Sequence, residues 1–99
     1  MVDYEFLWQQ LRTIEDPDVH VNVVDLGLIY GIEEKGNGIM VTMTLTSPSC
    51  PMGDFLLDSV KRTVLAVYPD KSVEVELVWD PPWNGDMVSE LGKMELGLL

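Results

Sequence analysis

The sequence has few of the residues on which several common functions depend: one cysteine, one histidine, and six basic residues against 17 acidic ones among 99. One cysteine excludes an internal disulfide, and with it the cross-linked scaffolds of small secreted proteins. The formal net charge of −11 disfavours nucleic acid and anionic membrane surfaces, because binding to either requires Lys and Arg. An acidic surface suits solubility, a basic partner or a cation.

Long apolar runs are also missing. The most apolar stretch, residues 21–32, is interrupted by Asn22 and Asp25 and is shorter than the roughly 20 residues of a membrane helix. The N-terminus carries neither a basic segment nor an apolar signal core, so we expect a cytoplasmic protein. The hydrophobic fraction of 46% and the three tryptophans argue against disorder. We expect one domain over residues 1–99.

Three segments have the periodic apolar residues of amphipathic helices: 3–15, 51–67 and 86–95. Asp3 is placed to cap the first of them. Asp58 and Arg62 lie one turn apart on the second, where they would form an ion pair.

Three other segments alternate apolar and polar residues as strands do: 28–32, 39–46 and 73–79. The first two predict a hairpin, and the last two predict a right-handed parallel crossover around the second helix. The order α-β-β-α-β-α then predicts an α/β two-layer sandwich, a small three-stranded mixed sheet with helices on one face. The other face would carry Thr42, Thr44, Glu74 and Glu76, either solvated or paired with a second subunit.

The sole cysteine, Cys50, lies in the segment TSPSCPMGD of residues 46–54, between the second strand and the second helix. Pro51 suits the first position of a helix, which would make Cys50 the cap residue. There the helix N-terminus would favour the thiolate, which is both the nucleophile and the metal ligand. The alternative is a buried structural thiol, since free cysteine is among the most buried residue types.

Several carboxylates precede or enter the apolar run, among them Asp16, Asp18 and Asp25. Asp25 either braces its loop by accepting backbone hydrogen bonds or joins the other two near Cys50 as a cation site or proton acceptor. His20 has valine neighbours in a loop and is not expected to act as a base for Cys50. No spacing of Cys and His resembles a zinc site, so metal coordination would be labile and shared between two copies.

Trp79 and Trp83 flank a rigid diproline in the run WDPPW. In one interpretation, Trp79 completes the core and Trp83 holds the last helix in place. In the other, the two side chains form an apolar corner that binds a partner protein, because aromatic residues are enriched in interface cores. The sequence leaves both interpretations open.

Four ordered motifs together resemble one family: DPD at 16–18, VDLGLIY at 24–30, TLTSPSCP at 44–51 and VWDPPW at 78–83. They look like the SufT/PaaD family, whose eukaryotic relatives are targeting subunits of cytosolic iron–sulfur cluster assembly. The resemblance implies a small α/β fold and an accessory or targeting role in iron–sulfur protein maturation, with scaffold or client proteins as partners. It places the family's reactive cysteine at Cys50, and its nearby acidic and threonine residues at Asp16, Asp25 and Thr46.

With one cysteine, the chain is not expected to hold a permanent cofactor; Cys50 would bind iron or an iron–sulfur cluster transiently. Two alternatives remain: a non-catalytic protein-interaction module in which Cys50 is structural, and an assembly factor for a phenylacetate-type ring-oxidising complex. An enzyme with a cysteine nucleophile is not expected, because the sequence offers no convincing base and no oxyanion motif. The small size and the open sheet face allow a homodimer.

Overall fold

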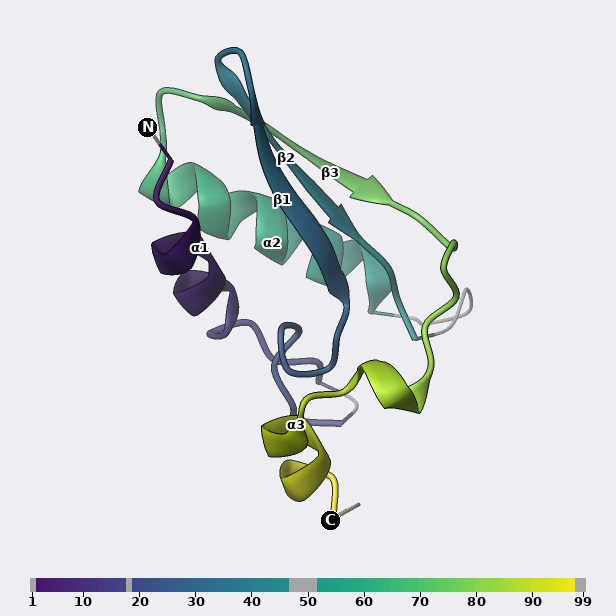
Figure 1. Ribbon diagram of the computed structural model, residues 1–99. Coiled ribbons are helices and arrows are strands. Elements are labelled where there is room, and N and C mark those ends of the chain that lie inside the picture. The colour runs from purple at the N-terminus through teal and green to yellow at the C-terminus, as the bar shows by residue number, and fades with distance from the viewer. Residues whose placement is uncertain (1, 18, 47–51, 98–99) are drawn as a thin grey trace.

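The computed structural model describes residues 2–17, 19–46 and 52–97. The elements follow the predicted order (Figure 1): α1 Tyr4–Leu11, β1 Ile29–Lys35, β2 Gly38–Met43, α2 Gly53–Val67, β3 Ser72–Leu77, a short 3₁₀ helix η1 Gly85–Met87, and α3 Glu90–Glu95. Asp3 caps α1 as expected, since its Oδ1 accepts a hydrogen bond from the Phe6 amide at 3.0 Å.

The three strands form one mixed sheet in the order β1-β2-β3. β1 and β2 are an antiparallel hairpin, whereas β2 and β3 are parallel and joined by α2. Figure 1 shows α2 behind the strands, α1 beside α2 at the left, and α3 beyond the lower end of the sheet. The predicted α/β fold with a three-stranded mixed sheet is therefore confirmed, but α3 packs at the end of the sheet and not on the helical face.

The core lies between the sheet and the two longer helices. Alternate residues of β2, namely Ile39, Val41 and Met43, are at most 2% exposed. They face a fully buried stripe on the helices that is formed by Leu7, Leu11, Leu56, Val60 and Val64. Burial of side chains of this size contributes about 1.5–3 kcal/mol each, so these two stripes hold the layers together. The predicted ion pair on α2 is also present, with Arg62 Nε 2.8 Å from Asp58 Oδ2.

Two helices differ from the prediction. α1 ends at Leu11 and not at residue 15, yet Ile14 stays buried because the chain turns back on itself. The predicted helix 86–95 is two short helices, because Val88 is extended and Ser89 begins a new cap. The Ser89 hydroxyl accepts a hydrogen bond from the Gly92 amide at 3.0 Å.

Thr44 was expected on the outer face of the sheet, either solvated or paired with a second subunit, but it is buried within the chain itself. β2 ends at Met43, so the strand alternation no longer decides where the following side chains point. The Thr44 amide donates to the Leu28 carbonyl at 2.9 Å, and the residue is fully buried. Of the other three residues predicted on that face, Glu74 and Glu76 are exposed and Thr42 is half-buried.

Among the described residues, no helix has the length and apolar character that crossing a membrane requires.

Candidate functional site

The candidate site lies at the end of the sheet where β2 and β3 finish. α2 follows β2 in the chain and connects it to the parallel strand β3, so the first turn of α2 lies at this same end. The loop of residues 12–28 and the chain after β3 also gather there, as the lower part of Figure 1 shows. Catalytic and binding residues of α/β folds commonly lie at the carboxyl ends of such strands.

Four hydrogen bonds at this end involve residues of the four sequence motifs or residues within two positions of them. The Val23 amide, just before the second motif, donates to the carbonyl of Ile14, two residues before the first, at 2.9 Å. Besides the bond from Thr44 to Leu28, the Val78 amide donates to the Met43 carbonyl at 2.9 Å. The Trp83 indole Nε1 donates to the Leu26 carbonyl at 2.7 Å. Motifs that are separated by up to 60 residues therefore form one contiguous region.

Cys50 lies outside the described residues, as do Asp18 and Pro51, so their predicted roles in binding or reactivity are not tested. The residues on either side of this segment pack against each other. Leu45 and Gly53 are both buried, and a Cβ atom on Gly53 would lie 2.7 Å from Leu45 Cδ1. This close approach brings together the two ends of the segment that carries Cys50.

The cap of α2 is Met52 and not Cys50, which corrects the prediction. The Leu56 amide donates to the Met52 carbonyl at 3.0 Å, and α2 begins at Gly53. The preference of proline for the first helical position is statistical, and here the packing of Gly53 under Leu45 places the helix start two residues later. The argument that the cap position favours the thiolate therefore no longer applies to Cys50.

Asp25 is 4% exposed, and both of its carboxylate oxygens accept hydrogen bonds. Oδ1 accepts from the Ser89 hydroxyl at 2.9 Å, and Oδ2 accepts from Asn22 Nδ2 at 2.6 Å. Its own amide donates to Asn22 Oδ1, and its carbonyl accepts from the Ser89 amide at 2.8 Å. These contacts make Asp25 a brace between its loop and the cap of α3, through side chains and not only through the backbone.

The other loop residues are placed differently. Asp16 is 2% exposed, its amide donates to the Val21 carbonyl at 3.0 Å, and its carbonyl accepts from the His20 amide at 2.8 Å. His20 is largely exposed, and its Nδ1 lies 3.3 Å from Glu15 Oε1. Thr46, at the edge of the Cys50 segment, is exposed. Of the predicted site residues that are described, the two carboxylates are therefore buried and the Thr46 hydroxyl group belongs to an exposed residue.

The two tryptophans differ from each other. Trp79 is 44% exposed, so the interpretation that it completes the core was wrong. Trp83 is partly buried against the core, and its indole N–H binds the loop that carries Asp25, so it holds this loop. Both remain candidates for partner binding, but Trp79 presents far more free surface.

Sequence reasoning missed Asn22, Ser89 and Tyr30. Asn22 stands three residues before Asp25, a spacing that signals an Asx-type turn, and Ser89 is a standard helix cap. The Tyr30 hydroxyl donates to the Pro81 carbonyl at 2.7 Å. Tyr30 and Pro81 line an open depression of about 510 Å³, together with Gly27, Ile29 and Met87.

The part of the chain that the structure describes contains no group of three or more His, Cys, Asp or Glu arranged to hold a metal ion. It also contains no buried side-chain nitrogen or oxygen without a hydrogen-bond partner. A hydrogen bond from Lys71 Nζ, at 2.9 Å, lowers the pKa of the Glu34 carboxyl group below 4.5. That pair lies near the hairpin turn, away from the candidate site.

A family model described as iron-sulfur cluster assembly protein matches residues 6–77, most of the chain. The chain belongs to this iron–sulfur cluster assembly family. The match ends at the last residue of β3, so it includes Asp16, Asp25, Thr46 and Cys50. The Trp79–Trp83 corner and α3 lie beyond it.

Two relatives extend the likeness over more of the chain. A protein of Porphyromonas gingivalis named Fe-S protein maturation auxiliary factor is 46% identical, covering 96% of this chain and 91% of the relative. The Fe-S protein maturation auxiliary factor SufT of Staphylococcus aureus is also 46% identical, covering 84% and 96%. A crystal structure of a DUF59 domain of unknown function from Bacillus anthracis is 34% identical. It superposes with a TM-score of 0.86 and covers 96% of this chain and 92% of that one.

These matches confirm the family resemblance and the accessory role in iron–sulfur protein maturation that it implies. The superposition on the DUF59 domain also agrees with the fold described above. The names of the two relatives describe auxiliary factors and not enzymes, which is compatible with a chain that catalyses no reaction of its own.

Proposed function

We propose that this chain assists iron–sulfur protein maturation through the end of the sheet where the four motifs meet, with Cys50 as its reactive residue. The observation that supports the proposal most directly is the convergence of these motifs, held by four hydrogen bonds that involve motif residues or residues within two positions of them. Cys50 lies in the third motif, and the described residues that flank its segment, Leu45 and Gly53, pack on each other at this same end.

The cargo would be iron or an iron–sulfur cluster that is held transiently. Clusters in proteins are commonly held by four cysteine thiolates, and one chain supplies one. A cluster bound at Cys50 would therefore need ligands from a scaffold protein, a client protein or a second copy. Coordination shared in this way is released by ligand exchange when the partner supplies its own thiolates, which suits transfer better than storage.

The neighbouring residues divide into supporting and exposed ones. Asp25 supports the site as a brace, because its carboxylate is already engaged by Asn22 and Ser89. Thr46 is exposed and directly precedes the segment that holds Cys50, so it is the better placed of the two to contact cargo or a partner. We assign the site's function to Cys50 and Thr46, and its shape to Asp25.

The test is complementation in cells that lack this protein, with the activity of an iron–sulfur enzyme as the readout. Cys50→Ser should reduce that activity to the level of cells without the protein. Ser49→Ala, in the same segment, is the matched control and should rescue as well as the wild type. Equal rescue by Cys50→Ser would remove Cys50 from the mechanism.

A second candidate function is a pure interaction module, and the 44% exposure of Trp79 favours it. Under this alternative, Trp79→Ala weakens binding to a scaffold or client protein while Cys50→Ser leaves binding and rescue intact. Reconstitution with iron and sulfide under anaerobic conditions separates the two functions. A protein that becomes coloured only when Cys50 is present supports the first.

A further inference from the structure

The two edges of the sheet differ in what covers them. On β1, the Glu34 amide donates to the Tyr4 hydroxyl at 3.1 Å, and the Tyr30 hydroxyl holds Pro81 against the start of the strand. β3 forms the other edge. Within the described ranges, the main chain of β3 has one hydrogen bond to a residue outside the strands, from the Ser72 amide to Asn37 in the turn between β1 and β2, and this bond lies on the β2 side. An uncovered edge strand is a template for another extended segment.

The direction of the free main-chain groups follows from the ladder. The Ser72 amide donates to the Asn37 carbonyl at 3.2 Å, and the Val78 amide donates to the Met43 carbonyl. In a parallel pair, alternate residues bond the neighbouring strand, so the even-numbered residues of β3 face β2. The amides and carbonyls of Val73, Val75 and Leu77 point away from the sheet and are available to an added strand.

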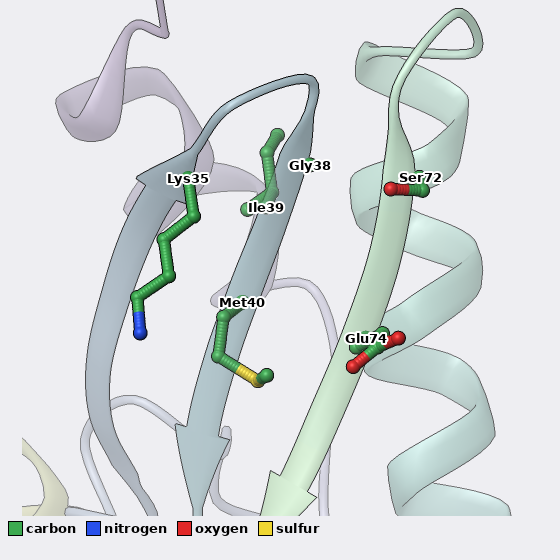
Figure 2. A pocket seen from close by; sticks show the side chains of 6 residues that line it. All are labelled: Lys35, Gly38, Ile39, Met40, Ser72 and Glu74. Carbon is green, nitrogen blue, oxygen red and sulfur yellow. The ribbon is translucent and has the colours of Figure 1, made fainter.

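The side chains beside this edge are acidic on one face and apolar on the other. Glu74 and Glu76 are exposed on the outer face, while Val75 and Leu77 are half-buried toward α2. Figure 2 shows Met40 and Glu74 on the face that is turned toward the viewer. A shallow hollow of about 210 Å³ lies there because Gly38 has no side chain opposite Ser72.

Charge decides between the candidate occupants of the edge. A second copy paired along β3 would bring the Glu74 and Glu76 side chains of two chains together, each with a net charge of −11. Like charges on adjacent strands are destabilising, and charged edges discourage self-association. The same two carboxylates would pair with Lys or Arg on every second residue of an added strand. The apolar residues between these would extend the buried face over α2.

We propose that the free edge of β3 binds an extended basic segment of a partner protein by strand addition, with Lys or Arg beside Glu74 and Glu76. Main-chain hydrogen bonds to Val73, Val75 and Leu77 would hold the segment, and the charges would select it. Lys35 on β1 lines the hollow on the opposite side of Met40 from Glu74 (Figure 2), so a basic side chain would lie along Met40 with its charge beside Glu74 and away from Lys35. This inference goes beyond the proposed function and does not depend on Cys50.

The experiment uses the full chain and a blocked octapeptide that alternates Lys and Val, followed by NMR. The peptide should slow the amide exchange of Val73, Val75 and Leu77, while the even-numbered residues, already bonded to β2, change little. Replacing Glu74 and Glu76 together by Lys should weaken binding roughly tenfold, since each cross-strand charge pair is worth up to about 1 kcal/mol.

The control variant is Glu33→Lys, which changes an exposed charge on the same face of the sheet but on β1. It should bind the peptide nearly as well as the wild type does. Three results would overturn the proposal: unchanged exchange at the three outward amides, equal weakening by the control, or a free protein that is already dimeric with those amides protected. Complementation by Cys50→Ser is a separate readout, so failure of either proposal leaves the other intact.

Discussion

Replacing Asp25 with Asn tests whether this residue braces the fold or serves the cargo. The carboxylate of Asp25 accepts one hydrogen bond from Ser89 and one from Asn22 in a site that is 4% exposed. If the NH₂ group of the new asparagine points toward Asn22, two hydrogen-bond donors face each other. If it points toward Ser89, the Ser89 hydroxyl loses the oxygen to which it donates. Hydrogen bonds to charged groups are worth about 1.5–3 kcal/mol, so we expect a loss of about 2 kcal/mol.

The assay is chemical and thermal unfolding, followed by tryptophan fluorescence. For a chain of this size, 2 kcal/mol corresponds to a fall of about 10 °C in Tm. The double variant Asn22→Asp with Asp25→Asn exchanges donor and acceptor at unchanged net charge, and it should recover at least half of that loss. An Asp25→Asn protein as stable as the wild type, yet inactive in complementation, would refute the brace and assign the carboxylate to cargo binding.

Two further predictions concern the backbone and the pH dependence. Gly27→Ala should destabilise the fold by more than about 2 kcal/mol in urea unfolding, because Gly27 has a φ of +79° and an added Cβ would collide with the Met87 carbonyl; a neutral effect would contradict the contact. Lys71→Met should lower stability at pH 7. Because the pKa of Glu34 is lowered from 4.5 in the folded chain, the pair stabilises the fold above that pH. The difference in stability between the variant and the wild type should disappear as the pH falls through the lowered pKa that Glu34 has in the folded chain. A stability difference that does not depend on pH would contradict the role of this ion pair.

The fold was largely predictable because its signals are local and repeated. Alternation along β2 and the i, i+4 stripe on α2 each involve several residues that agree, so the sheet order and the crossover followed from them. The errors fall where a single contact decides the outcome. Thr44 is buried because β2 ends at Met43, one residue before it. α2 starts at Gly53 because Gly53 packs closely under Leu45. Neither contact produces a repeating pattern of residues in the sequence.

The sequence predicted which motifs form the candidate site. It did not predict which residues of each motif support the fold and which are exposed to cargo or a partner. In the motif VDLGLIY, Asp25 braces α3 and Gly27 permits the approach of Met87. Both residues thus have a structural reason to be what they are, independent of any cargo. A motif match therefore locates the region without saying which of its residues touch iron, a cluster or a partner. Exposure separates the two groups here, because Thr46 and Trp79 reach solvent while Asp16 and Asp25 do not. The exposed residues are the ones whose loss should change transfer or binding without changing stability.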